Sequence, residues 1–531
     1  MSAAPPSGDI IDIPARSDGP SAQEIAARAS SDVLSALIEA RVTHGGAQIA
    51  VEDGDKRILS YEDLLRAVAA FSRVIKREIP GDVVGIFLPS SVGSVVAFYA
   101  VHAAGKTPAM LNFTAGRGPL LAAMKVANIS AVLTADRFLA VAKLEPIADA
   151  LRTVAPVLAL EALRTKVGWR DKLFAVLARP LKLFPKPAPD QTAAIVFTSG
   201  SEGDPKGVAL SHRNFLANCV QVTESLPIER AKVFFNPLPV FHSYGLGPGM
   251  ILPLVLGRKL VLHPSPLRAK EVAQRIKDTG ANVLLATDTF LRQYARAGDA
   301  DSLSTLLIAV CGAERVRSET RELVAERFSF AVLEGYGVTE TSPVLASNHP
   351  DDNRDGTVGR PLPGIELRLV HVEGLDDGRR LLVRGPNVMA GYIDAQTGRV
   401  VPPEDGWHDT GDVVAYEDGF LSIRGRLKRF AKIGGELTSL TLVEQLAGAA
   451  WPGALHAATV VPGERRGESI VLLTEEASPD QDALRAALGT LGLPERYLPD
   501  KVLTVEAVPV LGTGKVDNVA VTKLAKEMLA A

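Results

Sequence analysis

The chain has little cysteine. Its 531 residues include two cysteines, Cys219 and Cys311, which lie far apart and form no CxxC pair. A disulfide framework and a cysteine-ligated zinc site are therefore not expected, and the pattern fits a reducing compartment. We expect each thiol to be a small core residue.

Long apolar runs and a strong charge of one sign are also missing. Residues 245–262 come nearest to a membrane span, but glycines, prolines and Arg258 interrupt them before roughly 18 apolar residues accumulate. The formal net charge is −3, which gives no general reason to expect a nucleic-acid partner. The first residues lack the basic end and the apolar run of a secretory signal, so we expect a cytoplasmic protein.

The composition that remains is globular. Hydrophobic residues make up 47% of the chain, charged residues 22% and aromatic residues only 5%, so the core must be built largely from Ala, Val and Leu. The length predicts two or more domains. Apolar runs of strand length alternate with helical stretches, which predicts an α/β fold with mostly parallel sheets. The strand candidates are 83–89, 131–134, 193–198, 282–286, 306–310 and 331–336, and a helix is expected over 94–105.

The pattern of the sequence changes late in the chain. Residues 413–423 predict a hairpin that turns at Asp418-Gly419. A segment dense in glycine and charge, GRLKRFAKIGGE (425–436), follows it. We therefore predict a large N-terminal region of several subdomains over 1–425, with 1–30 as a loose tail, and a small mobile α+β domain over 426–531.

Residues 163–187 stand out for positive charge, and their only acid is Asp171. An apolar stripe with helical spacing predicts an amphipathic helix that ends near Pro180. The stripe is formed by Trp169, Leu173, Val176 and Leu177, and the cations are Lys166, Arg170, Lys172, Arg179, Lys182 and Lys186. Such a segment can lie on an anionic membrane, dock an acidic partner, or form an ordinary surface helix with a solvated face.

The sequence FTSGSEGDPKGVALSH (197–212) follows an apolar strand and precedes a helical pattern. Its glycines relax the backbone, so several N–H groups can turn together towards phosphate oxygens. Hydroxyl and ammonium donors add to this nest, namely Thr198, Ser199, Ser201 and Lys206. The pattern is neither the P-loop GxxxxGK(S/T) nor the dinucleotide motif GxGxxG, so it predicts a nucleotide-phosphate site of another kind.

This loop resembles the signature S/T-S/G-G-S/T-T-G-x-P-K-G of the adenylate-forming superfamily, which includes acyl-CoA synthetases. The matching positions are Thr198, Ser199, Gly200, Ser201, Gly203, Pro205, Lys206 and Gly207. Glu202 departs from the pattern, since the family usually has Thr there, and its carboxylate would repel a triphosphate unless Mg²⁺ or Lys206 intervenes. The resemblance implies an enzyme that uses ATP and Mg²⁺.

Further family motifs follow in order. EGYGVTET (334–341) matches G-Y-G-x-T-E, which implies that Tyr336 stacks on adenine, Thr339 contacts the α-phosphate and Glu340 binds Mg²⁺. CGAERV (311–316) lies where the family has an adenine-binding loop. The candidate nucleotide-binding residues of these two motifs are Gly312, Ala313, Glu314, Tyr336, Gly337 and Thr339.

HDTGDVV (408–414) carries the family's T-G-D element. The resemblance implies that Asp412 accepts hydrogen bonds from the ribose hydroxyls and that Arg426 is a second ribose contact. Lys428 aligns with the family's hinge position, about which the small domain rotates. Lys432 aligns with a lysine that some members use in the thioester step after adenylation.

Two further motifs supply catalytic candidates. PVLGTGKVDN (509–518) implies that Lys515 enters the site during adenylation and stabilises charge on the carboxylate and the α-phosphate. PLPVFHSYGLG (237–247) implies that His242 lines the acyl tunnel beside the carboxylate. With Thr198 and Glu340, these residues complete the predicted catalytic set.

The variants of these motifs are most similar to the synthetase half of the bifunctional lysophospholipid acyltransferase/acyl-carrier-protein synthetase. The resemblance covers nearly the whole chain from about residue 30. It implies that a long-chain fatty acid is converted to acyl-AMP and passed to the phosphopantetheine thiol of acyl carrier protein. The acyltransferase half is not found, which leaves a separate acyltransferase chain as a candidate partner. The basic segment 163–187 could meet the acidic carrier or hold the enzyme at the inner face of a membrane.

Three alternatives stay open at this point. The thiol acceptor could be coenzyme A. The substrate could be an aryl or amino acid, although KVFFNPLPVF (232–241) shows none of the Asp residues that amino-acid-activating relatives use. The chain could also be a non-catalytic acyl- or lipid-binding scaffold, against which the intact Lys515, Glu340 and Asp412 argue.

Overall fold

A computed structural model of the chain describes residues 10–179, 182–199, 205–375, 378–433, 436–463, 467–510 and 516–530. These residues form two compact units. The large unit comprises 14–366 and 384–408, and the small unit comprises the described parts of 1–13, 367–383 and 409–531. The units do not divide at 425/426, because strands on both sides of 384–408 join one sheet of the small unit. The predicted boundary at 425/426 concerns a moving domain and stays a prediction.

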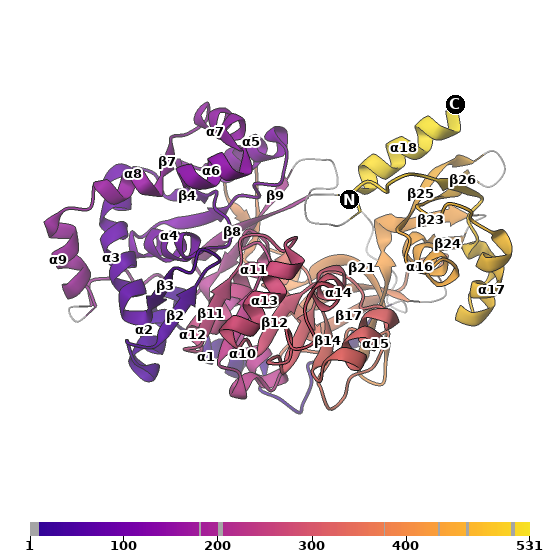
Figure 1. Cartoon of the computed structure of the whole chain (residues 1–531), viewed down its shortest axis with the longest axis horizontal. Coiled ribbons are helices and arrows are strands. Elements are labelled where there is room, and N and C mark those ends of the chain that lie inside the picture. Colours follow the sequence, from indigo (N-terminus) through magenta and orange to yellow (C-terminus); the bar gives the residue numbers. More distant parts are fainter. Residues whose placement is uncertain are drawn as a thin grey trace. The chain divides into compact units, whose positions relative to one another are not determined.

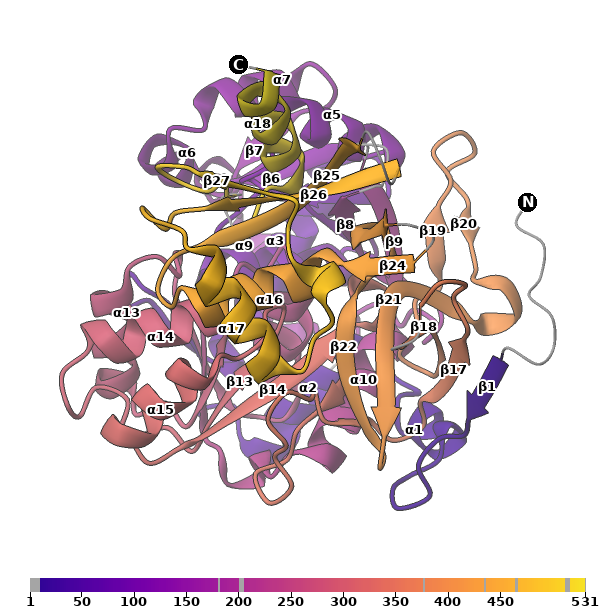
Figure 2. The same cartoon turned by 90° about the vertical axis from the view of Figure 1, so that its right-hand side faces the viewer.

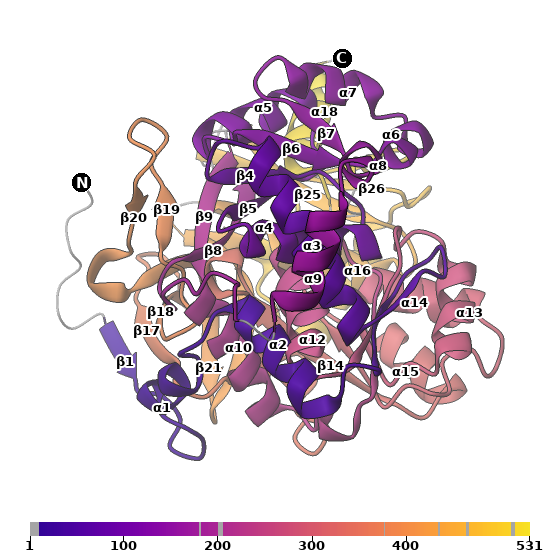
Figure 3. The same cartoon turned by 90° about the vertical axis from the view of Figure 1, so that its left-hand side faces the viewer.

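The large unit contains an eight-stranded sheet that is parallel in its centre and antiparallel at one edge (Figures 1 and 3). Its strand order is β20 (Val400–Val401), β19 (Gly391–Ile393), β9 (Pro205–Ser211), β8 (Thr192–Ser199), β5 (Thr107–Met110), β4 (Val83–Ile86), β6 (Ala131–Thr134) and β7 (Val157–Ala159). Helices α5 (Arg117–Val126), α6 (Asp136–Ala142) and α7 (Glu145–Arg152) pack their apolar side chains on one face. Parallel strands need such crossover helices, so the alternation read from the sequence leads directly to this layer.

A nine-stranded sheet forms the second half of the large unit. Its order is β16 (Arg360–Pro361), β15 (Val344–Ser347), β14 (Ala331–Gly337), β13 (Ile308–Cys311), β12 (Val283–Ala286), β10 (Val233–Asn236), β11 (Lys259–Leu262), β2 (Ile49–Glu52) and β3 (Ile58–Ser60). Helices α13 (Ala269–Thr279), α14 (Asp288–Ala297) and α15 (Ser318–Arg327) cover one face. The carboxyl ends of β12, β13 and β14 therefore meet at one edge of this sheet.

Apolar helices lie between the two sheets. Helix α4 (Val92–Ala103) is buried along nearly its whole length, contacts the eight-stranded sheet at β4 and β5, and packs on α2 (Val33–His44) and α3 (Tyr61–Glu78). Helix α10 (His212–Ser225) contacts β9 of one sheet and β15 of the other. Residues 245–262 are also core, as predicted, because α11 (Ser243–Leu246), the π-helical turn η2 (Gly247–Ile251) and α12 (Leu252–Val255) are largely buried. Among the described residues, none of the helices combines the length and hydropathy that a membrane span requires.

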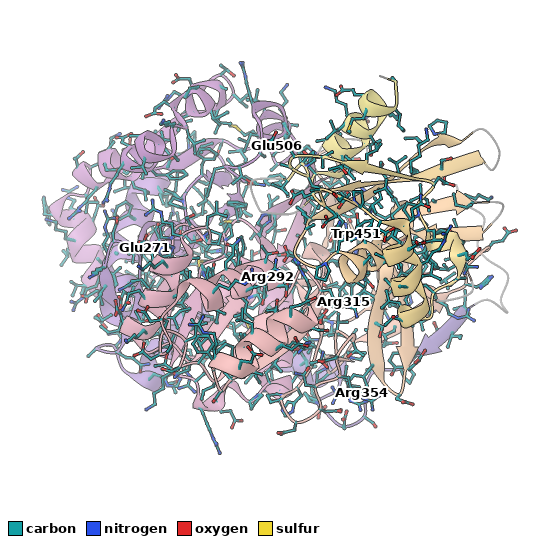
Figure 4. All side chains as sticks on the ribbon, turned by 45° about the vertical axis from the view of Figure 1, so that its right-hand side comes forward. Glu271, Arg292, Arg315, Arg354, Trp451 and Glu506 are labelled. Carbon is teal, nitrogen blue, oxygen red and sulfur yellow. The ribbon has the colours of Figure 1, made fainter. Side chains whose placement is uncertain are left out.

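The small unit consists of two further sheets (Figure 2). The first has the order β1 (Ile10–Ile13), β17 (Glu366–Val370), β18 (Arg379–Arg384), β21 (His408–Glu417) and β22 (Phe420–Arg426). The second contains β24 (Glu436–Ser439), β23 (Phe430–Ile433), β26 (Gly467–Thr474), β25 (His456–Gly463) and β27 (Lys501–Thr504). Helices α16 (Leu440–Ala450) and α17 (Gln481–Leu491) pack on one face of the second sheet around Trp451, and α18 (Asn518–Ala530) packs on the other (Figure 4).

Most predicted elements are confirmed. The six strand candidates correspond to β4, β6, β8, β12, β13 and β14, and the helix expected over 94–105 is α4. The late hairpin is β21–β22, and it turns at Asp418 and Gly419, whose φ values of 52° and 86° are the left-handed conformations that such a turn requires. The α/β fold with a large mixed-sheet region and a smaller C-terminal part is thus confirmed.

One prediction is wrong in part. The tail expected over 1–30 is structured from residue 10, since β1 pairs antiparallel with β17 and α1 (Ala22–Arg28) begins at a capping box of Ser21 and Glu24. The segment 197–212 follows strand β8 and precedes helix α10, as predicted, and its second half adds strand β9. This strand pairs antiparallel with β8, because Val208, Ala209 and Leu210 are buried in the sheet, and α10 starts directly after Ser211.

Candidate functional site

The β8–β9 hairpin places Thr198 directly opposite Lys206. Thr198 is half-buried near the end of β8, and Lys206 is exposed near the start of β9. The predicted phosphate-binding residues Gly200, Ser201 and Gly203 lie outside the described residues, as does the side chain of Ser199. The described part of the motif thus brings a hydroxyl and a primary amine together at the loop end of the hairpin.

Tyr392 connects this hairpin to Glu340. Strand β19 pairs with β9, with Tyr392 opposite Val208, so the phenol lies on the same sheet edge as Lys206. The Lys206 amine lies over the Tyr392 ring, 4.9 Å from its centroid. The Tyr392 hydroxyl donates a 2.7 Å hydrogen bond to Oε1 of Glu340. One aromatic side chain therefore orients a cation and an anion of the two principal motifs.

Glu340 lies in the short 3₁₀ helix η3 (Thr339–Thr341), which follows β14. Its backbone oxygen accepts a 2.7 Å hydrogen bond from the Met389 amide, which fixes the turn against the segment before β19. The register between β14 and β15 shifts between Tyr336 and Gly337. A Cβ atom at Gly337 would overlap the Pro343 carbonyl oxygen, so this close approach requires glycine.

The same turn contacts the predicted acyl-tunnel segment. Thr339 Oγ1 accepts a 3.3 Å hydrogen bond from the Ser243 hydroxyl at the first residue of α11. His242 is the residue before α11, and its ring lies 4.6 Å from the Phe241 ring, centroid to centroid. The structure therefore brings His242, through its neighbour Ser243, to the turn that carries Thr339 and Glu340.

An aromatic cluster continues from His242 into the eight-stranded half of the large unit. Its centroid distances run from 4.8 Å between Phe241 and Phe113 to 5.0 Å between Phe113 and Phe138, and Phe87 completes it at 6.3 Å from Phe113. Phe87 and Phe241 are buried, whereas Phe113 and Phe138 are partly exposed. The chain thus has a cluster of aromatic side chains, two buried and two half-buried, next to the candidate site.

The predicted adenine loop lies at the carboxyl end of β13. The Gly312 amide donates a 3.1 Å hydrogen bond to the Ala286 carbonyl, and a Cβ atom at this glycine would meet the Tyr244 ring at 3.1 Å. Ala313 is exposed and has a φ of 69°, in the left-handed region. The Glu314 carboxylate accepts a 3.0 Å hydrogen bond from the Thr289 amide near the start of α14, which gives this side chain a structural contact.

Glu334, one strand away, is the most perturbed acid of this region. It is buried opposite Cys311, and burial raises the pKa of its carboxyl to about 7 although the Arg321 guanidinium opposes the shift. Arg321 also forms a 3.1 Å ion pair with Asp355. Figure 4 shows Arg292 on α14 and Arg315 on the adjoining loop, so basic side chains flank this edge of the nine-stranded sheet.

The predicted ribose-binding pair lies in the small unit. Asp412 on β21 and Arg426 on β22 are direct cross-strand partners, and Arg426 Nε donates a 3.1 Å hydrogen bond to Asp412 Oδ1. The carboxylate is buried, but 66% of the Arg426 side chain is exposed. The Thr410 hydroxyl accepts from the Asp412 amide at 3.1 Å, which fixes the strand at this point.

The structure describes two of the three lysines predicted for the small unit. Lys428 is exposed in the 3₁₀ turn η5 (Leu427–Arg429), directly after β22. Lys432 is exposed on β23, and its amide donates a hydrogen bond of 2.6 Å to the Glu468 carboxylate. Lys515 lies outside the described residues. Both described lysines are accessible, and their predicted roles stay predictions.

A family model described as AMP-binding enzyme matches residues 38–393. The chain belongs to the AMP-binding enzyme family. It is accordingly an ATP-dependent acid–thiol ligase that uses Mg²⁺. Glu340 fits that cation, because it is a half-buried carboxylate oriented by Tyr392 and Mg²⁺ is commonly held by one or two carboxylates together with substrate phosphates.

Curated relatives of this AMP-binding enzyme span most of its length. A feruloyl-CoA synthase of an Amycolatopsis species is 29% identical over 90% of this chain and 94% of its own. The 3-[(3aS,4S,7aS)-7a-methyl-1,5-dioxo-octahydro-1H-inden-4-yl]propanoyl:CoA ligase of Mycobacterium tuberculosis is 33% identical over 78% and 83%. The medium-chain fatty-acid–CoA ligase of Escherichia coli is 29% identical over 63% and 61%.

Solved structures agree on the fold. ATP-bound MatB from Rhodopseudomonas palustris has a TM-score of 0.78 at 24% identity and covers 94% of this chain and 99% of its own. The o-succinylbenzoate CoA synthetase MenE from Bacillus subtilis, in complex with an acyl-adenylate, has a TM-score of 0.78 at 20% identity, covering 91% and 97%. At these identities the likeness shows the fold.

Sequence reasoning missed Tyr392, Ser243 and Tyr244. Tyr392 stands in a short Gly-Tyr-Ile strand that carries no recognisable motif, and only the pairing of β19 with β9 brings it to Lys206 and Glu340. Ser243 and Tyr244 directly follow the predicted His242, so their position was the available signal. The Tyr244 hydroxyl donates a 2.7 Å hydrogen bond to the Val310 carbonyl just before the adenine loop.

Proposed function

We propose that this AMP-binding enzyme activates an apolar carboxylic acid as acyl-AMP and transfers the acyl group to the thiol of coenzyme A. The observation that carries the adenylation step is the Lys206–Tyr392–Glu340 arrangement, which joins the two nucleotide motifs of the matched family in one site. The names of the relatives, which are CoA ligases, support coenzyme A over acyl carrier protein as the acceptor. Transfer to acyl carrier protein, expected from the motif variants, stays the alternative.

The chemistry needs two displacements. A carboxylate oxygen attacks the α-phosphorus of ATP, the bond to the pyrophosphate oxygen breaks, and acyl-AMP forms. The thiol sulfur then attacks the acyl carbon, its proton is released, and AMP leaves with the former bridging oxygen. Both steps move negative charge, so cations and N–H donors that are already oriented lower the barrier.

The residues of the large unit suit the first displacement. Lys206 and Thr198 supply an ammonium group and a hydroxyl at the loop end of the β8–β9 hairpin, where the phosphates would bind. The motif adds Ser199, Gly200, Ser201 and Gly203 to the proposed phosphate-binding residues. Glu340 would hold Mg²⁺, which supplies positive charge beside the phosphate oxygens when bound. Tyr336, Gly337 and Thr339, with the 312–314 loop, would bind the adenosine and the α-phosphate.

The residues of the small unit would complete the site. We propose that Asp412 and Arg426 bind the ribose, since a buried carboxylate with an exposed guanidinium beside it offers both acceptors and donors. Lys515 would stabilise the charge that develops on the α-phosphate. Rotation about Lys428 would then replace Lys515 with residues of the thioester step, including Lys432.

The proposed acid is a fatty acid, because the aromatic cluster of Phe87, Phe113, Phe138 and Phe241 gives the region next to His242 an apolar character. His242 would then lie beside the acid's carboxylate. A long acyl chain further suggests that substrate arrives from a membrane, and a separate acyltransferase would be a consumer of the product. Both cysteines are free and buried, which supports a reducing, cytoplasmic setting.

The test is acid-dependent pyrophosphate release with ATP and Mg²⁺, over fatty and aryl acids of increasing size, followed by addition of coenzyme A or holo acyl carrier protein. We expect release with apolar acids and an acyl thioester on coenzyme A. A thioester formed only on the carrier protein would support the adenylation step but refute coenzyme A as the acceptor.

Lys515→Ala separates the enzyme from the scaffold hypothesis. The variant should lose pyrophosphate release while it still binds ATP, because the lysine acts on the reacting carboxylate and phosphate and not on the adenosine. Lys526→Ala, a lysine of α18, is a matched control that should keep full activity. If no acid supports release by the unmodified chain, the scaffold hypothesis replaces the enzyme.

A further inference from the structure

The basic segment predicted from the sequence contains the helix α9 (Trp169–Leu177), and its apolar stripe faces outwards. Trp169 is 69% exposed, Leu173 51% and Val176 57%. Leu177 and, after the helix, Leu183 are exposed as well. Large apolar side chains scattered singly on a surface need no explanation, but a contiguous stripe on one helix marks an interaction site.

The opposite face of α9 attaches the helix to the large unit. Asp171 is buried and accepts hydrogen bonds from Arg73 at 3.2 Å and Arg77 at 3.5 Å, both on α3. The Arg73 guanidinium also lies over the Phe174 ring, 5.0 Å from its centroid. Figures 1 and 3 show α9 on the outer side of α3. The helix that carries the exposed stripe is therefore attached to α3 by its opposite face.

Cations flank the stripe on both sides. At about 100° per residue, Arg170 lies roughly 75° to one side of the centre of the stripe and Lys172 roughly 85° to the other. Lys182 and Lys186 follow in the segment after the helix and are exposed. Within the described parts of the chain, no ion pair involves these four residues, and the only acid of the segment, Asp171, is buried.

From this arrangement we infer that α9 and residues 182–187 lie on an anionic lipid bilayer, with Trp169, Leu173, Val176 and Leu177 inserted at the headgroup boundary and the flanking cations among the phosphates. A bilayer surrounds the whole footprint with negative charge, whereas a protein partner would have to supply acids on both flanks of an apolar core. Lysine is also depleted at protein–protein interfaces, while its long stem lets it reach headgroups from beside an apolar stripe.

This surface does not depend on which acid or thiol the enzyme uses, but it fits a substrate that partitions into membranes. It would bring the large unit to the phase that holds the fatty acid. The binding involves no nucleotide, so it can be measured apart from catalysis. Failure of vesicle binding and failure of adenylation are therefore separate results.

The experiment is flotation of the full chain with vesicles of equal parts phosphatidylcholine and phosphatidylglycerol, beside vesicles of phosphatidylcholine alone. We expect binding to the anionic vesicles that weakens as salt is raised. Leu173→Glu should weaken binding about tenfold or more. Arg170→Glu and Lys172→Glu should each weaken it by about fivefold or more, since each cation near an anionic surface contributes about that factor.

Matched controls are Val141→Glu, at an exposed apolar position of α6, and Lys270→Glu on α13. Both should bind like the unmodified chain. All variants should retain pyrophosphate release with a water-soluble acid, which shows that they fold. Trp169 fluorescence should shift to the blue on binding, and Trp169→Phe should lose this shift.

Several results would overturn the proposal. One is no binding to anionic vesicles at low salt, and another is binding that Leu173→Glu leaves unchanged. Self-association that Leu173→Glu abolishes, without vesicle binding, would assign the stripe to a second copy of the chain. Binding to an acidic carrier protein but not to vesicles would assign the cations to that partner.

Discussion

Removing the Tyr392 hydroxyl should impair the use of Mg²⁺ by this enzyme. The hydroxyl donates a 2.7 Å hydrogen bond to Oε1 of Glu340, the only hydrogen bond to this carboxylate that the described residues show. We proposed Glu340 as a Mg²⁺ ligand, and the loss of a group that orients a metal ligand typically changes metal affinity or activity about 10–100-fold. A hydrogen bond to a charged group contributes about 1.5–3 kcal/mol, which gives a similar range. Because Glu340 is only half-buried, Tyr392→Phe should raise the Mg²⁺ concentration for half-maximal pyrophosphate release about tenfold, near the lower end.

Tyr392→Leu separates the two functions of the side chain. Phenylalanine keeps the ring over which the Lys206 amine lies, whereas leucine removes it. A cation–π contact at an accessible site contributes about 0.5–1 kcal/mol, so Tyr392→Leu should raise the KM for ATP about two- to fivefold beyond the effect of Tyr392→Phe.

Tyr294→Phe is the matched control for both variants. The hydroxyl of Tyr294, on α14, donates a 2.9 Å hydrogen bond to the Pro266 carbonyl, so this variant also loses one tyrosine hydrogen bond without touching Glu340. The control should keep its Mg²⁺ dependence even if its thermal stability falls. An unchanged Mg²⁺ dependence in Tyr392→Phe would refute the idea that Tyr392 positions Glu340.

Three further substitutions test other parts of the site. Asp412→Asn should raise the KM for ATP about tenfold or more, because it removes the charged acceptor proposed for the ribose. The KM for the acid should stay nearly unchanged. Steady-state kinetics with each substrate varied in turn tests this, and a change confined to the KM for the acid would contradict the assignment. His242→Ala should do the opposite and raise the KM for the acid, and an effect on ATP alone would remove His242 from the acyl site. Burial raises the pKa of Glu334 from 4.5 to about 7, so the folded state retains a proton that the unfolded state releases, and stability should fall as pH rises between these values. Glu334→Gln should flatten this part of the thermal-midpoint profile, and a profile of unchanged slope would rule out Glu334 as its source.

The sequence was sufficient for elements whose pattern is local. The buried strands β4, β6, β12 and β13 are short apolar runs between helices, and the β21–β22 hairpin has its Asp-Gly turn in the sequence. That hairpin also explains why Asp412 and Arg426 could be predicted together. The two residues are separated along the chain, but a hairpin turn of known geometry brings their strands together, and the structure pairs them directly.

Other features depend on contacts that no local pattern encodes. Tyr392 reaches Glu340 because β19, together with its hairpin partner β20, adds to a sheet whose other strands come from the first half of the chain. The N-terminal residues were expected to be loose, since nothing near them in sequence reveals that β17 offers a free edge to β1. The compact units cross the predicted boundary for the same reason, because strand pairing joins segments that are distant in the chain.

The outward orientation of the apolar stripe of α9 could not be predicted from the sequence either. Helical spacing identified the stripe of Trp169, Leu173, Val176 and Leu177, but periodicity usually indicates the face that packs on the core. Here the opposite face of the helix does the packing, because Asp171 accepts hydrogen bonds from two arginines of α3 and the Phe174 ring contacts one of them. The exposure of each side chain was needed to distinguish an ordinary solvated surface helix from an interaction site.

The most direct test of the central claim is exchange of labelled pyrophosphate into ATP in the presence of Mg²⁺ and a fatty acid, with no thiol added. Formation of acyl-AMP as a separate first step predicts exchange that requires the acid and proceeds without coenzyme A. Exchange that appears only when a thiol is present, or formation of ADP in place of AMP, would contradict an acyl-adenylate mechanism for this enzyme.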